Sequence, residues 1–412
     1  MDHTTLLYLI LGISLFSYLF DQGLEYLNLK SQKNDFPEEI ASFYDREKYL
    51  KSLEYHRELT RFGFITSAFS FSLSFLMLVF GGFGMLDSWL RPWIHYEILL
   101  ALVFFGIIVL VADVLTLPFQ WHSTFVIEEK FGFNKTTLKI FIQDKLKSHI
   151  LGAVIGIILI SILFYLIRMI GSSFWIWFGL VAAGFMLFIN MFYTSLILPL
   201  FNKLTPLPDG DLKSAIESFA LKVNFPLDNI FVMDGSKRSA KANAFFSGIG
   251  KKKKIVLYDT LIKNHTTEEL VAVLAHEAGH FKKKHIVWSY VLSAVQIFFM
   301  LYILSLMVFN GNLSLALGGT QYALHLNLVA FGILFSPISG ITGLLMSLYS
   351  RRNEYEADAY ARDNFDGTAM ANALKRLSVD TLSNLYPHPA YVFFHYSHPT
   401  LLQRLAALAG KN

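Results

Sequence analysis

The chain has 412 residues, of which 54% are hydrophobic, 16% aromatic and only 16% charged, with a formal net charge of +4. Soluble domains usually carry about 25% charged residues, so this composition and the mean hydropathy of +0.46 exclude an ordinary soluble enzyme, and no nucleic-acid partner is expected. The chain contains no Cys, which excludes disulfides, thiol nucleophiles and thiolate metal sites, so any metal must be bound by His and carboxylate side chains.

Long apolar stretches run through the chain, and a helix needs about 20 such residues to cross the hydrocarbon core of a bilayer. Seven stretches are candidates: Leu6–Phe20, Phe62–Leu86, Ile98–Phe119, Ile150–Ile170, Phe174–Phe201, Ile286–Phe309 and Leu326–Tyr349. The first is short, but it has no basic region before it and no small-residue cleavage site after Phe20, so we expect an anchor rather than a signal peptide. The sequence predicts a mainly α-helical, polytopic membrane protein with seven transmembrane helices.

The distribution of basic residues predicts how these spans are oriented. All but two of the 35 Lys and Arg residues fall in the four loops that seven spans place on one side, which are 21–61, 120–149, 202–285 and 350–412. The exceptions are Arg91, in a loop on the other side, and Arg168, at the end of a span. Because Lys and Arg gather on the cytoplasmic side, we expect the four loops in the cytoplasm and the N-terminus outside.

Two of the cytoplasmic segments are long enough to fold outside the bilayer, and they flank the last two spans. We expect them to pack together as one discontinuous domain. The predicted organisation is an N-terminal membrane domain of five helices at 1–201, a cytoplasmic segment at 202–285, two transmembrane helices at 286–349 and a C-terminal cytoplasmic segment at 350–412.

Asp113 lies inside the third predicted span, where a carboxylate is energetically costly. Such a residue is a candidate for a functional role. It is equally well interpreted as a hydrogen-bonded carboxylate beside a polar interior, and the sequence leaves both interpretations open.

The segment from Thr266 to His280 predicts a helix that carries metal-binding side chains. Thr266 is a typical cap residue, and Glu269 lies in the first turn. His276 and His280 are four residues apart, so both imidazoles lie on one helical face and can bind one ion. Glu277 is rotated by about 100° from His276, which lets it reach a water on the metal without binding the metal. Two His ligands with a Glu as general base are the arrangement of zinc metallopeptidases.

Catalytic zinc usually has three protein ligands, so a third ligand is needed. His285 is on the wrong face and too near to supply it. Directly after the last span, Arg351–Ala359 favours a helix in which Glu354 and Asp358 share a face and Glu356 points away. We expect Glu354 as the third ligand of one Zn²⁺ per chain, with Asp358 hydrogen-bonded to a ligating His or assisting proton transfer. Taken alone, the stretch also suits a solvated helix at the membrane surface.

A β-hairpin is predicted before the zinc helix, with strands at Ser239–Phe246 and Ile255–Leu261. The connection, residues 247–254, contains four lysines that we expect in solvent or near lipid headgroups rather than on a substrate. A strand edge beside a zinc helix can bind an extended peptide through backbone hydrogen bonds, although a purely structural hairpin has the same pattern. The residues expected to bind substrate are Asn243, Ala244 and Phe245.

With these motifs in place, the chain resembles the type I CAAX prenyl proteases, which are integral-membrane zinc metallopeptidases. The resemblance covers essentially the whole chain and rests on an ordered set of motifs: Phe125–Lys135, Pro199–Leu207, Ala242–Phe246, His276–His280, Asn353–Asp358 and Ser397–Pro399 with Arg404. It implies zinc bound by His276, His280 and Glu354, with Glu277 as the base. It also implies a gluzincin-type cytoplasmic catalytic domain and a water-filled chamber walled by the seven helices.

His398 and Arg404 lie near the C-terminus, in the predicted cytoplasmic segment. Peptide hydrolysis at zinc develops an oxyanion, and an imidazole or guanidinium that faces it lowers the barrier. Arg404 could instead bind a carboxylate or carbonyl of the substrate. The resemblance favours these functional roles. Without it, a helix that starts at Pro399 and an ion pair between Arg404 and a neighbour would explain both residues.

The expected function is zinc-dependent peptide hydrolysis in a membrane. The resemblance implies removal of the last residues after a prenylated cysteine, so the expected partners are the lipid bilayer and a peptide or protein substrate that carries a prenyl group. One alternative is a broad-specificity protease for bacterial membrane-protein quality control. A transporter with a structural metal is disfavoured, because it would have no use for Glu277. The expected location is the bacterial inner membrane, or the endoplasmic reticulum in a eukaryote.

Overall fold

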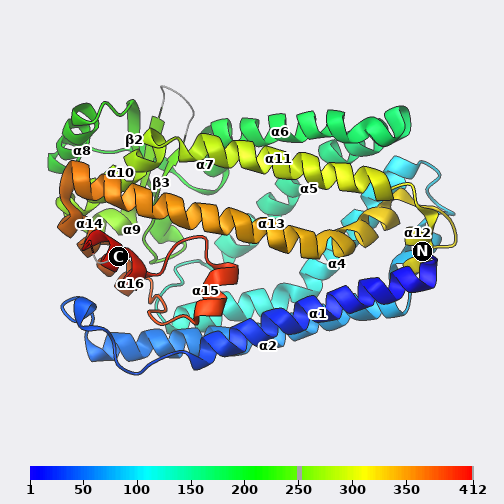
Figure 1. Cartoon of the computed structure of the whole chain (residues 1–412), viewed down its shortest axis with the longest axis horizontal. Helices are drawn as coiled ribbons and strands as arrows, with labels where there is room; N and C mark the ends of the chain where they lie inside the picture. The colour runs from blue at the N-terminus through cyan, green and yellow to red at the C-terminus, as the bar shows by residue number, and fades with distance from the viewer. Residues whose placement is uncertain (248–252, 411–412) are drawn as a thin grey trace.

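The computed structural model describes residues 1–247 and 253–410, and its long helices run between the two ends of an elongated molecule (Figure 1). These helices are α1 (His3–Lys30), α2 (Arg46–Val79), α4 (Glu97–His122), α5 (Leu138–Ile170), α6 (Phe174–Phe192), α11 (His285–Met307) and α13 (Leu324–Ala361). In the described residues, six segments are long and apolar enough to cross a membrane, and one of them, Leu138–Phe201, contains both α5 and α6. Every predicted span overlaps one of these helices. The number of crossings and their orientation stay predictions.

Two predicted spans are interrupted. The span at Phe62–Leu86 is wrong beyond Val79, because α2 ends there and a new helix, α3 (Gly82–Leu90), follows Gly81. Gly81 has a left-handed φ of 63°, and a Cβ atom on it would lie 3.1 Å from the Cα of Gly318. The span at Phe174–Phe201 continues past α6 as a π-helical turn and the short α7 (Leu198–Phe201), where Pro199 has no N–H to extend the regular pattern.

The long helices are not packed into a solid bundle. In the six apolar segments, only 6–17% of the most apolar window is buried inside the protein. Helices in a close-packed core bury their side chains on several faces. Most side chains of these windows are therefore not buried by other parts of the described protein, as expected for helices that face lipid, and the chamber stays a prediction.

A four-stranded sheet lies beside this frame, in the strand order β1-β2-β4-β3. Its strands are β1 (Leu204–Pro206), β2 (Leu227–Met233), β3 (Ala244–Ser247) and β4 (Lys253–Tyr258). β3 and β4 are antiparallel and confirm a hairpin, but β4 also pairs with β2 in parallel, and β2 pairs with β1 in antiparallel orientation. The sequence did not predict β1 and β2. Residues 248–252 of the predicted connection lie outside the described residues.

The predicted hairpin strands are too long at one end each. The first begins at Ala244 rather than Ser239, because the backbone before it is held by the loop after α4: the Ala240 N–H donates to the Phe133 carbonyl. The second ends at Tyr258 rather than Leu261, because Asp259 begins the short helix α9 (Asp259–Asn264).

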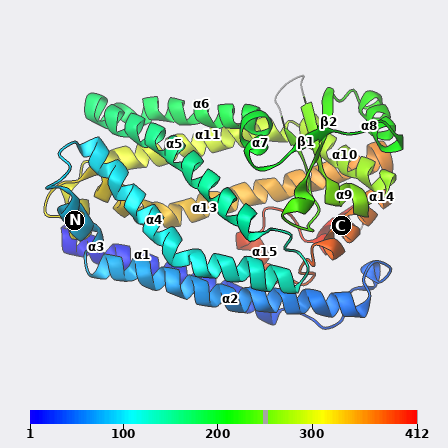
Figure 2. The same ribbon diagram turned by 180° about the vertical axis from the view of Figure 1, so that it is seen from behind.

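The segments 202–285 and 350–412, which are predicted to be cytoplasmic, share one hydrophobic core at the end of the molecule where α8, α9, α10 and α14 lie (Figure 2). Its buried members include Ile216, Ile255 and Val271 from the first segment and Ala361 and Met370 from the second. The helices around it are α8 (Asp211–Lys222), α10 (Thr267–Lys282), α14 (Gly367–Asp380) and α16 (Leu401–Leu408), while α15 (Pro389–His395) packs on α1 and α13. The two segments therefore pack around a common core, and the division of the chain into domains stays a prediction.

At the opposite end, α3, α12 (Gly311–Ala316) and the start of α13 enclose a buried polar cluster. The Nε2 atom of His325 lies 2.8 Å from Asp87 Oδ1, and Arg91 Nε donates to Asp87 Oδ2 at 2.8 Å. His325 and Asp87 are both fully buried. The other ring nitrogen of His325, Nδ1, has no hydrogen-bond partner in the described residues, and the ring packs 4.5 Å from that of Phe104.

Asp113 is paired with a cation. The Lys145 ammonium donates to Asp113 Oδ1 at 2.7 Å, and His149 Nε2 lies 3.3 Å from Oδ2. Gln120 donates a weaker hydrogen bond at 3.3 Å. Of the two interpretations left open by the sequence, the geometry matches the hydrogen-bonded carboxylate.

Candidate metal centre

Helix α10 starts as its sequence predicts. The backbone N–H of Glu269 donates to Thr266 Oγ1, and the Glu269 carboxylate accepts from the backbone N–H of Thr266, so both halves of a capping box are present. Arg376 Nε donates to the same carboxylate at 2.9 Å, which fixes this end of α10 to α14. The start of the metal-binding helix is therefore held both locally and by its neighbour.

Gly279 allows α10 and α13 to approach closely. A Cβ atom at this position would lie 3.0 Å from the Cα of Ala357 and 2.9 Å from the Cβ of Tyr360. No such atom is present, so the turn of α10 that carries the two histidines lies against the turn of α13 that carries Glu354. The absence of a side chain at Gly279 thus allows ligands from two distant segments to meet.

The three predicted ligands meet at one point. His276 Nε2 and His280 Nε2 are 3.1 Å apart, and Glu354 has Oε2 3.5 Å from the first and Oε1 3.4 Å from the second. Ligand atoms 2.0–2.1 Å from a tetrahedral ion lie about 3.3 Å from one another. Glu354 Oε2 is buried and accepts no hydrogen bond in the described residues, although the Arg404 guanidinium lies 3.4 Å away, so this oxygen can accept a metal ion. The site therefore fits one metal ion.

Asp358 and Arg404 hold the first of these histidines from behind. His276 Nδ1 donates to Asp358 Oδ1 at 2.8 Å, which directs the Nε2 lone pair toward the ligand cluster. Arg404 donates to both oxygens of Asp358, at 2.8 and 2.7 Å, and its third nitrogen lies 3.4 Å from Glu354 Oε2. Burial alone would lower the pKa of Arg404, but hydrogen bonds and the charge of Asp358 raise it above its usual value, so the guanidinium is charged.

Glu277 and His398 flank the ligand cluster. Glu277 is half-buried one residue after the first ligand, and its carboxylate accepts no hydrogen bond within the described residues. His398 has a side chain that is 62% exposed, with Nε2 3.4 Å from Glu354 Oε1. A carboxylate without a partner and an accessible imidazole are both available to a bound molecule.

The comparisons with known proteins agree with this geometry. Residues 206–412 match peptidase family M48, and residues 25–203 match the CAAX prenyl protease N-terminal domain, which has five membrane helices. The chain belongs to peptidase family M48. Family M48 enzymes are metallopeptidases, so this protein is a polytopic membrane metallopeptidase.

Individual family members match along nearly their whole length. CAAX prenyl protease 1 of Saccharomyces cerevisiae is 33% identical, and the match covers 99% of this chain and 96% of the relative. The human CAAX prenyl protease 1 homolog is 33% identical, over 90% of this chain and 88% of the relative. The crystal structure of S. mikatae Ste24p superposes with a TM-score of 0.92 at 32% identity, covering 98% of this chain and 99% of that one.

The strand predicted to bind substrate lies at the edge of the sheet of this M48 peptidase. Among the described strands β3 pairs only with β4, and Asn243 precedes it. The Tyr258 N–H donates to the Asn243 carbonyl, and hydrogen-bonded pairs alternate along an antiparallel ladder, so the backbone groups of Ala244 face away from β4. The outward N–H of Ala244 donates to Asn243 Oδ1 at 2.8 Å. The backbone N–H and C=O groups of Phe245 face β4 instead.

The sequence predicted most residues of the metal centre but not the positions of two residues beside it. The structure brings together His276, His280, Glu354, Asp358, His398 and Arg404 as expected, with Glu277 beside them. It also places His285 against His280, and Glu356 against His285, although His285 was rejected as a ligand and Glu356 was expected to point away. Neither belongs to the group of three side chains that could hold a metal ion, and the spacing of five residues from His280 to His285 gave no helical signal, because a break separates α10 from α11.

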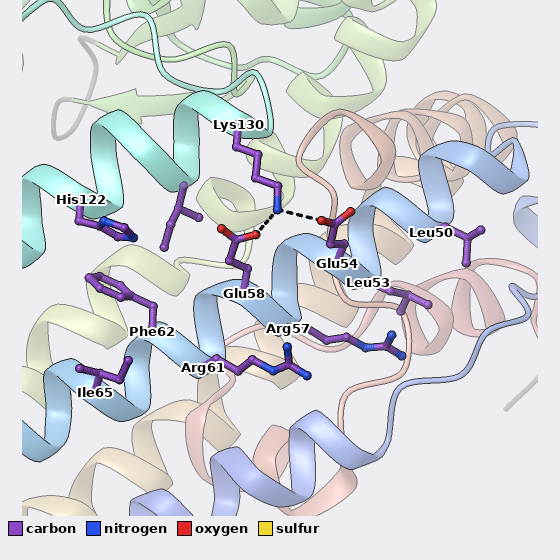
Figure 3. A pocket seen from close by; sticks show the side chains of 11 residues that line it. Leu50, Leu53, Glu54, Arg57, Glu58, Arg61, Phe62, Ile65, His122 and Lys130 are labelled. Atoms are coloured by element: carbon purple, nitrogen blue, oxygen red, sulfur yellow. Dashed lines mark hydrogen bonds and ion pairs between the residues drawn. The ribbon is translucent and has the colours of Figure 1, made fainter.

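A separate pocket of about 670 Å³ lies between α2 and the end of α4 with the π-helical segment Ser123–Glu128 that continues it (Figure 3). Lys130 binds both Glu54, at 2.8 Å, and Glu58, at 2.5 Å. Arg57 and Arg61 point to the other side of α2 in Figure 3. None of the residues that line this pocket belongs to the metal centre of the M48 peptidase.

Proposed function

We propose that this protein is a zinc-dependent CAAX prenyl protease, an endopeptidase that removes the C-terminal residues after a prenylated cysteine. The observation that carries the proposal is a complete three-ligand site with an unpaired glutamate beside it, in a chain that matches CAAX prenyl proteases along nearly its whole length. The names of these relatives supply the substrate class. The membrane setting suits a substrate that carries a lipid.

The ligand set favours zinc among the divalent metals. Two imidazoles and one carboxylate, with a position left open for water, are a common catalytic zinc site. When bound by His276, His280 and Glu354, zinc would lower the pKa of a water molecule and polarise the scissile carbonyl. We infer one zinc ion per chain.

The residues around the ligands then have distinct tasks. Glu277 takes a proton from the attacking water and delivers it to the leaving amine, because its carboxylate has no competing hydrogen bond. Asp358 keeps His276 in the tautomer that exposes Nε2, and Arg404, which is bound to Asp358, keeps that carboxylate in place. His398 is exposed and close enough to donate to the oxygen that gains charge in the transition state.

The edge of β3 positions the peptide. An extended substrate can add to the sheet by pairing with the outward backbone groups of Ala244, provided that Asn243 Oδ1 releases the N–H that it now accepts. The Asn243 side chain is then free to bond to the substrate backbone. The Ala244 N–H therefore has a hydrogen-bond acceptor both before the substrate binds, in Asn243 Oδ1, and afterwards, in the substrate backbone.

The location follows from the same reasoning. With the orientation predicted by the basic loops, the metal centre faces the cytoplasm. The membrane is the inner membrane if the host is a bacterium and the endoplasmic reticulum if it is a eukaryote.

The test compares matched peptides that differ only in a farnesyl group on the cysteine. Detergent-purified wild type should cleave the farnesylated peptide after the cysteine with a higher kcat/KM than the unmodified one, and removal of zinc by a chelator should abolish both activities. The Glu277→Gln variant is the matched inactive control. Equal kcat/KM on both peptides would instead favour a protease of broad specificity, and cleavage that survives metal removal would contradict the proposal altogether.

A further inference from the structure

The second zinc-binding histidine has a buried neighbour that the metal site does not use. Lys284 has a left-handed φ of 60° between α10 and α11, and this break turns the chain so that His285, the first residue of α11, faces back toward α10. His285 is only 5% exposed. Its Nδ1 atom lies 3.0 Å from Nδ1 of His280, and the two rings meet edge to face at 74°.

The direction of this hydrogen bond follows from the ligand cluster. His280 Nε2 lies 3.1 Å from His276 Nε2 and 3.4 Å from Glu354, so its lone pair must be directed there to bind a metal. A neutral imidazole carries one proton, which then sits on His280 Nδ1. Because two nitrogens in contact share one proton, Nδ1 of His285 is the acceptor.

The same reasoning extends one residue further. With Nδ1 of His285 as an acceptor, its proton is on Nε2, and this atom lies 3.3 Å from Glu356 Oε2. The other oxygen of Glu356 accepts from Arg352 Nε at 3.0 Å. In this series of contacts every donor faces an acceptor. The series runs from Arg352 through Glu356 and His285 to Nδ1 of His280, and it leaves the lone pair of His280 Nε2 directed at the metal position.

The two zinc-binding histidines are thus oriented by different means. His276 donates directly to a carboxylate, that of Asp358. His280 has no carboxylate on Nδ1, and His285 occupies the space between it and Glu356. Any buried imidazole needs polar partners, but here the partner of His285 Nδ1 is a candidate metal ligand, so the pair also fixes the orientation of that ligand.

We propose that His285 and Glu356 are positioning residues, which fix the tautomer and ring orientation of His280 as a zinc ligand. This inference rests on the proposed zinc site. It predicts that the pair affects zinc affinity itself, in addition to any effect on the stability of the fold.

The experiment measures zinc affinity in detergent-purified protein by competition with a chromogenic chelator. His285→Leu should weaken zinc binding by about 10–100-fold, as the loss of such outer partners does. His285→Asn should restore most of the affinity, because the amide oxygen takes the place of Nδ1 and accepts from His280. Glu356→Leu, at a residue with a one-third exposed side chain, should weaken binding less than His285→Leu and remain folded.

The matched control is His265, another buried histidine of the same cytoplasmic segment. Its Nδ1 lies 3.2 Å from the Leu261 carbonyl, and it is not connected to the ligand cluster. His265→Leu and His265→Asn should change the thermal unfolding temperature without changing zinc affinity. A second readout is the visible absorption of Co²⁺ in the site, which should change in His285→Leu and return in His285→Asn.

The outcomes separate this inference from the proposed function. If His280→Ala retains stoichiometric zinc, the metal site itself is assigned wrongly. If His280→Ala loses zinc while His285→Leu and Glu356→Leu bind it as tightly as the His265 variants, only the positioning role is overturned. If His285→Leu does not fold, the comparison of His285→Asn with Glu356→Leu decides: wild-type affinity and an unchanged Co²⁺ spectrum in Glu356→Leu contradict the proposal.

Discussion

Helix α13 takes part in two histidine–aspartate pairs, one near each end, supplying the histidine of the first and the aspartate of the second. Near its start, His325 binds Asp87 at 2.8 Å, with Arg91 on the same carboxylate. Near its end, Asp358 binds His276 at 2.8 Å, with Arg404 on the carboxylate. The positions 325 and 358 are roughly 50 Å apart along the helix, at 1.5 Å per residue.

The two pairs differ in the surroundings of the histidine ring nitrogen that does not face the aspartate. His276 directs Nε2 at two further ligand atoms, whereas the free nitrogen of His325 is buried against the ring of Phe104 and has no partner in the described residues. The same three residue types thus serve a metal at one end and hold helices together at the other. An Arg–Asp–His cluster is therefore no indication of catalysis until the unused nitrogen is located.

The largest expected effect is the difference between removing His276 and removing His325. His276→Ala should remove both zinc and peptidase activity, because two ligands do not complete the site. His325→Ala should keep zinc at one ion per chain and lower the thermal unfolding temperature instead. Elemental analysis with a peptide-cleavage assay checks both variants, and stoichiometric zinc in His276→Ala would contradict the ligand assignment.

The next effect concerns the residue after each histidine, which is Glu277 at the metal end and Leu326 at the other. Glu277→Gln should lower kcat by about 10²–10⁴-fold, since the amide keeps the shape but cannot accept the proton. Zinc content and thermal stability should stay at wild-type values. Activity within about tenfold of wild type would show that Glu277 is not the general base.

A smaller effect tests the two carboxylates. Asp358→Asn should weaken zinc affinity by about 10–100-fold, because the amide can present an N–H to His276 and disturb its tautomer. Asp87→Asn should leave zinc affinity unchanged and cost about 1–3 kcal/mol of stability, the usual result of a mispaired buried polar group. Chelator competition and thermal unfolding of both variants check this, and equal zinc affinities would remove the distinction drawn between the pairs.

The smallest effect lies outside both clusters, at the edge of β3. Asn243→Ala should lower kcat/KM about threefold to tenfold, because it removes one hydrogen bond of about 0.5–1.5 kcal/mol to the peptide backbone. Zinc occupancy should not change, and prenylated and unmodified peptides should be affected equally. Steady-state kinetics on both peptides measure this, and an effect confined to the prenylated peptide would place Asn243 near the lipid instead.

Most residues of the metal centre could be predicted, because the spacing of residues within one helix determines which side chains share a face. His276 and His280 share a face through the helical repeat, as do Glu354 and Asp358, and Thr266 marks the start of α10. The apolar spans were predictable for the same reason, since each is a property of one continuous segment.

The parts that were not predicted depend on contacts between distant segments. β1 has three residues, and β2 pairs in parallel with β4 across an intervening 3-10 turn and strand β3, so neither has a local signature. His285 meets His280 only because Lys284 adopts a left-handed conformation between two helices. The break at Gly81 likewise requires Gly318, which lies more than two hundred positions away in the chain.

The close approach at Gly279 also sets an order of events during synthesis. Two ligands precede α11, and the third follows the apolar part of α13, so a nascent chain that has emerged only as far as α11 lacks the residue that completes the site. Both of the last predicted spans must be inserted, and α13 must dock on α10, before the peptidase can bind its metal tightly. A chain that lacks α13 therefore has only two of the three ligands, so the active site depends on one of the last helices to be synthesised.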